Sequence, residues 1–171
     1  MCTRLVSTYK FLGSFLNSFL CRVEKDAADW QRLNGGEEAY VLLYIQAAKR
    51  AGFGNDRDLF VASGLLSYAG DTEMLWLNKT LQSVTRQLVY KEMFIPEAIL
   101  AQFNTEQLAL IDFLVLSKSR TFVGIGSSTF SVYLREYRKI QGYTKRSDNV
   151  FVSSKAIGTD QLFQRCSHIS D

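Results

Sequence analysis

The chain has 171 residues, of which 47% are hydrophobic and 22% charged, a composition that excludes a disordered tail, a collagen-like repeat and a heptad rod. Its net charge of +3 is too small to indicate nucleic-acid binding without a clustered basic patch. The length fits one domain with one core.

Strand and helix patterns alternate along the sequence. Short apolar runs predict strands, and apolar residues at helical spacing between capping signals predict helices. In chain order we expect a strand at 15–21, a helix at 37–51, a strand at 58–62, a helix beginning at Asp71 or Thr72, a strand at 87–90, a helix at 105–117, a strand at 121–125 and a helix at 127–141. Asn104 and Gln107 match an N-cap residue and its N3 partner, and Pro96 suits a first helical position. This alternation predicts an α/β fold, with a parallel sheet and helices on both faces.

The amino-terminal segment and the cysteines exclude several classes of protein. The apolar stretch from 5 to 20 is interrupted by polar residues, so it predicts neither a membrane span nor a clean signal peptide. The three cysteines lie far apart without a C-x-x-C pair, and His168 is the single histidine. Zinc knuckles and dithiol redox motifs are thereby excluded, and no metal site is expected.

The segment from Phe122 to Ser131 is the best candidate ligand site. A buried strand ends there in Gly124 and Gly126 and opens into hydroxyl residues, with Ser127 and Ser128 at the start of a helix. The N–H groups and the dipole of a helix start bind anions, and glycine lets a phosphate approach the backbone. The segment lacks the lysine of a Walker loop and the third glycine of G-x-G-x-x-G. Two interpretations stay open: a phosphate cradle, or a helix simply capped by Ser127 or Ser128.

Two charged residues extend this candidate site. Arg22 follows the first strand, so it faces the carboxyl edge of the sheet and can clamp a diphosphate; alternatively it is a surface arginine paired with Glu24 or Asp26. Asp112 lies in an apolar run, where a carboxylate is costly unless it is paired or hydrogen-bonded. It can accept from the N–H groups of a purine or, alternatively, cap a neighbouring loop.

Together these segments resemble the carboxyl-terminal half of GDP-fucose protein O-fucosyltransferases. The resemblance covers about residues 15–165, and Leu20–Asp26 resembles the His-x-Arg segment at the head of that half. Its other motifs are Ile111-Asp112-Phe113-Leu114-Val115-Leu116, Phe122-Val123-Gly124, Ser128-Thr129-Phe130-Ser131 and Arg135-Glu136-Tyr137-Arg138.

The resemblance implies a sugar-nucleotide transferase of the GT-B type that inverts at the fucose carbon and requires no metal. Residues 15–165 would form its Rossmann-like donor-binding domain, after a lead-in at 1–14 and before a tail at 166–171. The donor would be GDP-fucose. Arg22 would hold the diphosphate and Asp112 would read the guanine. Ser128, Thr129 and Phe130 would enclose the phosphates and the sugar. The acceptor would be a hydroxyl of a protein or glycan, in the secretory pathway.

The chain also departs from the family pattern. Leu20 stands at the position of the family's histidine, and the family's first domain has no counterpart in 171 residues. We therefore expect a fragment or a degenerate copy, whose catalytic residues the sequence does not identify. The main alternative is a non-catalytic α/β interaction module derived from such an enzyme. A third hypothesis, nucleic-acid binding through the basic and aromatic residues of 135–146, lacks the expected charge excess, so no nucleic-acid partner is expected.

Overall fold

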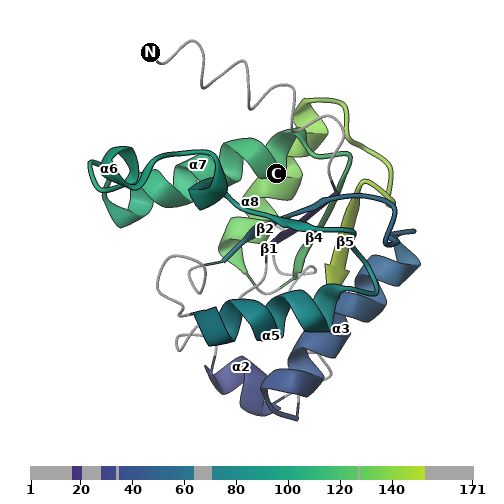
Figure 1. Cartoon of the computed structure of the whole chain (residues 1–171). Coiled ribbons are helices and arrows are strands. Elements are labelled where there is room, and N and C mark those ends of the chain that lie inside the picture. The colour runs from purple at the N-terminus through teal and green to yellow at the C-terminus, as the bar shows by residue number, and fades with distance from the viewer. Residues whose placement is uncertain (1–16, 21–27, 34, 64–70, 127, 153–171) are drawn as a thin grey trace.

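The computed structural model of the chain describes residues 17–20, 28–33, 35–63, 71–126 and 128–152 (Figure 1). Its strands are β1 (Asn17–Leu20), β2 (Leu59–Ala62), β3 (Leu88–Val89), β4 (Thr121–Ile125) and β5 (Asn149–Val152). Its helices are α2 (Ala28–Leu33), α3 (Glu37–Arg50), α5 (Asp71–Leu81), the 3-10 turn η2 (Lys91–Met93), α6 (Glu97–Leu100), α7 (Thr105–Lys118) and α8 (Thr129–Ile140). Each strand and helix predicted above has a counterpart here, with bounds that differ by a few residues.

All five strands run parallel, in the order β3-β2-β1-β4-β5. The chain builds outward from β1 through β2 to β3, then returns to the other side of β1 to add β4 and β5. The strand order therefore reverses between β1 and β4, where Phe19 pairs with Val123. The predicted α/β fold with a parallel sheet is confirmed.

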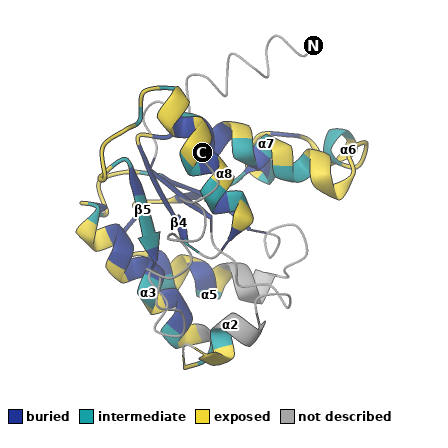
Figure 2. Cartoon of the chain, turned by 180° about the vertical axis from the view of Figure 1, so that it is seen from behind, coloured by how far each residue is buried: buried dark blue, intermediate teal, exposed yellow. Residues whose placement is uncertain are grey.

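Helices cover both faces of the sheet, with α3 and α5 on one side and α7 and α8 on the other (Figure 1). Side chains alternate along each strand, so Phe19 and Val61 pack towards α3 and α5, whereas Leu20 and Phe60 pack towards α7 and α8. Strand residues are almost all buried, while the helices expose their outer faces (Figure 2). This arrangement explains why the strands are apolar runs and not alternating patterns.

Local capping signals in the sequence correspond to real helix ends. Asn104 accepts a hydrogen bond from the Gln107 N–H at 2.9 Å, and the Gln107 side chain accepts one from the Asn104 N–H at 2.9 Å, so the predicted capping box begins α7. Gly52 follows α3 with a φ of 77°, a left-handed conformation that favours glycine and ends the helix. Pro96 is the N-cap of α6 and precedes its first residue by one position.

The sequence analysis missed three elements: α2, η2 and β5. The strand β5 has four residues and follows a polar loop. The predicted limits of the domain, 15 and 165, lie outside the described residues and stay a prediction. Within the described ranges no helix is long and apolar enough to cross a bilayer.

A buried arginine ties the amino edge of the sheet together. Arg138, near the end of α8, is completely buried. Its guanidinium donates to the Asn149 side chain at 2.8 Å and to the carbonyls of Leu116, Ser119 and Asp148 at 2.9, 2.8 and 3.0 Å. Burial lowers the pKa of Arg138 to about 10, although electrostatic interactions with Tyr143 and Asp148 act to raise it. The nucleic-acid hypothesis counted Arg138 within its basic segment, but this side chain is inside the protein.

Candidate functional site

The point where the strand order reverses lies between β1 and β4. In parallel α/β sheets ligands bind outside the strand ends where the strand order reverses, and β1 and β4 are these neighbouring strands here. In chain order β4 is followed by α8 on one face of the sheet, and β1 is followed by α2 and α3 on the other. Arg22 and Ser127, which we predicted to lie at this edge, are outside the described residues.

The two glycines of the predicted phosphate loop have different surroundings. A Cβ at Gly124 would lie 2.5 Å from Phe122 Cζ and 2.7 Å from Ser131 Oγ, so the absence of a side chain allows α8 to pack closely against β4. Among the described residues, a Cβ at Gly126 would meet Phe151 Cβ alone, at 4.0 Å. Close packing of α8 on β4 therefore requires glycine at 124, whereas no described neighbour requires it at 126.

Ser128 is the N-cap of α8. Its Oγ accepts a hydrogen bond from the Ser131 N–H at 3.5 Å, so the capped-helix interpretation describes the observed geometry. The phosphate-cradle interpretation remains open beside it, because the first N–H groups of a helix have no acceptor within the helix. In α8 these groups belong to Thr129, which is exposed, and Phe130, which is half-buried. The buried Ser131 Oγ accepts and donates no hydrogen bond within the described part of the chain.

Asp112 lies on α7 and forms a buried ion pair with Lys91, the first residue of η2, two positions after the end of β3. The Lys91 Nζ is 2.9 Å from Asp112 Oδ2 and 3.1 Å from Glu92 Oε1, and the Lys91 and Asp112 side chains are only 4% and 10% exposed. Sequence reasoning predicted that Asp112 needs a partner but named a ligand or a loop. The signal that was missed is a lysine immediately after an apolar strand, at the carboxyl edge.

Burial dominates the electrostatics of this pair. It raises the pKa of Asp112 to about 6, against the opposing attraction and hydrogen bond of Lys91. For Lys91, burial lowers the pKa, but the charge and hydrogen bond of Asp112 outweigh it and the pKa rises. Asp112 Oδ1 is buried and accepts no hydrogen bond from the described residues. The carboxylate is thus held through one oxygen, and its second oxygen has unused acceptor capacity.

An aromatic cluster joins α7 to the start of α8. Phe113, next to Asp112, meets Phe130 edge-to-face at 5.5 Å and Tyr137 at 5.4 Å between ring centroids. The structure therefore gathers Gly124, Gly126, Ser128, Thr129 and Phe130 in one turn and places Asp112 on the adjoining helix.

Metal ligands do not cluster in the described part of the chain, where no group of three or more His, Cys, Asp or Glu side chains could hold an ion. All three cysteines and His168 fall outside the described ranges. The site as described offers hydroxyls, helix N–H groups and one carboxylate, which are groups for binding a phosphorylated, hydrogen-bonding ligand.

Comparison with known proteins supplies the family. The family model described as GDP-fucose protein O-fucosyltransferase matches residues 23–141, a span that includes α7, the turn after β4 and α8. No curated protein matches the chain closely enough to add to this. The match covers well over half of the sequence, and the chain therefore belongs to the GDP-fucose protein O-fucosyltransferase family.

Proposed function

We propose that this chain is the donor-binding half of a fucosyltransferase of the GT-B type, which transfers fucose from GDP-fucose to a hydroxyl of a protein or glycan. The family supports a fucosyltransferase-like function and implies a GDP-fucose donor and a protein acceptor. The observation that carries the donor assignment is the buried Asp112 carboxylate. One of its oxygens is held by Lys91, and the other has no partner in the described part of the chain.

Asp112 would recognise the guanine. The Watson–Crick edge of guanine presents two adjacent N–H donors, which a carboxylate can accept and a uracil or cytosine edge does not match. Lys91 is then a positioning residue, because it fixes the carboxylate through Oδ2 at 2.9 Å and balances its charge. Since Oδ1 is buried in the free chain, the base has to displace the side chains that cover it.

The turn after β4 would bind the diphosphate and the sugar. The N–H groups at the start of α8, the Ser128 and Thr129 hydroxyls and the open space above Gly126 suit phosphate oxygens. Arg22 is the proposed clamp on the diphosphate, and Phe130 the apolar wall beside the sugar. As the bond to fucose breaks, negative charge develops on GDP, and these donors stabilise it. The proposal requires no metal ion.

Acceptor binding and cellular location complete the proposal. The acceptor site would come from a further domain in front of this one, as the family resemblance implies. The enzyme would act in the secretory pathway, where protein acceptors of this family are modified. The sequon Asn78-Lys79-Thr80 has its Asn78 exposed on α5, so it would then be open to glycosylation. Expression in a secreting cell followed by mass measurement tests this, because an attached glycan increases the mass.

A non-catalytic module derived from the same family is the second candidate. Leu20 stands where the family has a histidine, and its side chain is 8% exposed and packs in the core beneath α7 and α8. A leucine held in the core contributes no hydrogen bond to a sugar nucleotide. This candidate predicts a folded chain with no affinity for GDP-fucose.

Calorimetric titration of the full chain distinguishes the two candidates. GDP-fucose and GDP should bind, whereas UDP and a UDP-sugar should not. The variant Asp112→Asn should lose at least tenfold in affinity for GDP, because one guanine N–H then faces an amide donor. Asp58→Asn, which breaks an exposed ion pair with Arg86, is the matched control. Equal binding of UDP, or full affinity in Asp112→Asn, would contradict the donor assignment; a folded chain without any binding would establish the second candidate.

A further inference from the structure

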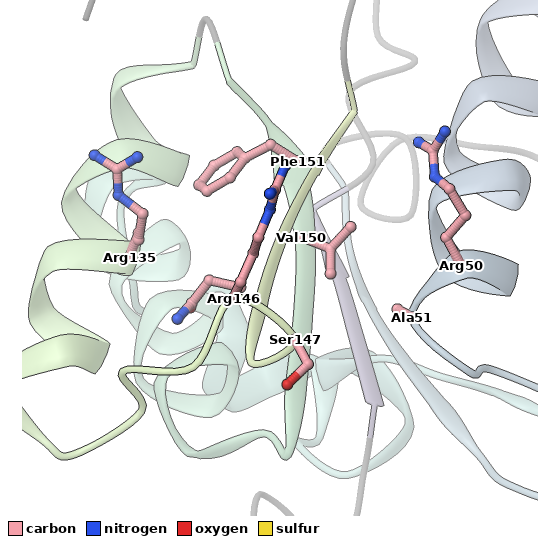
Figure 3. A pocket seen from close by; sticks show the side chains of 8 residues that line it. Arg50, Ala51, Arg135, Arg146, Ser147, Val150 and Phe151 are labelled. Carbon is pink, nitrogen blue, oxygen red and sulfur yellow. The ribbon is translucent and has the colours of Figure 1, made fainter.

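A groove of about 790 Å³ lies beside β5, which is the outermost strand next to β4 in the described part of the sheet (Figure 3). Arg50 ends α3, and Arg146 and Ser147 precede β5, so the groove includes the amino edge of the sheet. The proposed donor site lies at the carboxyl edge. Apart from Phe151, which also borders Gly126, the residues that line the groove have no part in the function proposed above.

The groove is strongly basic. The described residues that line it include Arg50, Arg135 and Arg146 and no acid. Arg135 also pairs with Glu136 at 2.6 Å and lies over the Phe151 ring, with its guanidinium carbon 5.3 Å from the ring centroid. Arg50 and Arg146 are exposed. The charge of this surface is complementary to an acidic partner.

The backbone of β5 offers hydrogen bonds towards the groove. In the parallel pair with β4, Phe122 lies opposite Asn149, and its N–H donates to the Asp148 carbonyl at 2.9 Å. Main-chain groups of successive strand residues point to opposite edges, so those of Asp148 and Val150 face β4. The N–H and C=O groups of Asn149 and Phe151 consequently face away from β4, and no strand of the described residues pairs with them.

The arginines flank this edge on both sides. Figure 3 shows Arg135 and Phe151 on the α8 side of β5, and Arg50 and Val150 on the α3 side. Side chains of an added strand would alternate between these two sides. An acidic residue on either side would then meet an arginine, and its apolar neighbours would pack on Val150 or Phe151.

We propose that the edge of β5 binds an extended acidic peptide segment of another protein by strand addition. Main-chain pairing with Asn149 and Phe151 supplies the affinity, and Arg50, Arg135 and Arg146 select for acidic side chains. The recognised segment carries acids on both faces around a β-branched centre. The proposal does not rest on the donor site, but Phe151 borders both, since a Cβ at Gly126 would lie 4.0 Å from Phe151 Cβ; the peptide is therefore titrated without GDP-fucose.

The test is titration of the full chain with a fluorescent peptide, Glu-Glu-Val-Val-Glu-Glu, followed by anisotropy. Arg50→Glu and Arg146→Glu should each weaken binding about fivefold or more, as expected for exposed ion pairs that turn repulsive, and high salt should weaken it as well. Lys79→Glu, an exposed charge reversal on α5, should leave the affinity unchanged. Circular dichroism verifies that each variant is folded.

Two further arms test the mode of binding. A peptide with alternate N-methylated residues keeps the charges but loses main-chain donors, and it should not bind; hydrogen exchange at the Asn149 and Phe151 amides should slow with the unmodified peptide. The peptide Lys-Lys-Val-Val-Lys-Lys reverses the charges of the acidic peptide. Binding of this peptide, or of the N-methylated one, with the same affinity as the unmodified acidic peptide would overturn the proposal. So would equal loss in Lys79→Glu, or binding of a sulfated heparin oligosaccharide in place of the peptide.

Discussion

Two buried cations occupy opposite edges of the sheet, and their surroundings differ. At the amino edge Arg138 donates to backbone carbonyls and to Asn149. At the carboxyl edge Lys91 pairs with the carboxylate of Asp112, whose second oxygen has no partner in the described part of the chain. Arg138 joins α7, α8 and β5, so it stabilises the fold. The Lys91–Asp112 pair keeps acceptor capacity at the edge where ligands bind, so it suits a site.

The largest effect is expected for Arg138→Met. Removing the guanidinium leaves several buried carbonyls without donors, each costing about 1–3 kcal/mol. We therefore expect the free energy of unfolding to fall by about 4 kcal/mol, measured by urea denaturation. The control Arg120→Met removes an exposed side chain and should change stability by less than about 0.5 kcal/mol. A similar small effect in both variants would end the distinction between the two cations.

A double-mutant cycle on Lys91 and Asp112 is expected to give the next largest effect. Lys91→Met leaves a buried carboxylate beside Glu92, so it should lower the free energy of unfolding by about 3 kcal/mol. The double variant Lys91→Met/Asp112→Leu should lower it by less than the sum of the two single changes. Urea denaturation of the four proteins gives the coupling. Additive losses would show that the pair is not coupled in the folded protein.

The pH dependence of stability follows from the raised pKa of Asp112. Burial raises the pKa of Asp112 in the folded chain to about 6, from an ordinary value of 3.8. Its contribution to stability is therefore full below about pH 4 and is lost as the pH rises through 6, by about 3 kcal/mol. Stability relative to Asp112→Asn should fall by that amount between pH 3 and pH 7 in urea denaturation. A difference that is constant or rises with pH would contradict the burial of this carboxylate.

The smallest effect concerns the two glycines of the turn after β4. Gly124→Ala places a Cβ within 2.7 Å of Ser131 Oγ, and overpacking of this kind costs about 2 kcal/mol. Gly126→Ala should leave stability within about 0.5 kcal/mol but reduce GDP affinity, because the methyl group occupies the proposed phosphate space. Thermal melts and GDP titration of both variants measure this. The reverse pattern would move the ligand away from Gly126.

Much of the fold follows from local patterns that the sequence displays. The capping box at Asn104 and Gln107 and the stop at Gly52 depend on residues close in the chain, so their effects can be predicted without tertiary contacts. Repeated apolar strands between helices predict a parallel sheet, because both faces must be covered. The strand β5 was not predicted, and its place in the sheet depends on its pairing with β4.

By itself, the sequence determined the α/β class, the resemblance to the fucosyltransferase family and the turn from Gly124 to Phe130, since these depend on composition, order and neighbouring residues. Only the tertiary structure decided that Lys91 is the partner of Asp112, that Arg138 is buried, and that three arginines surround the edge of β5. Each of these depends on residues distant in the chain that the sheet brings together. Local periodicity contains no information about which distant charges will meet, and that meeting determines whether a buried charge stabilises the fold or forms a site.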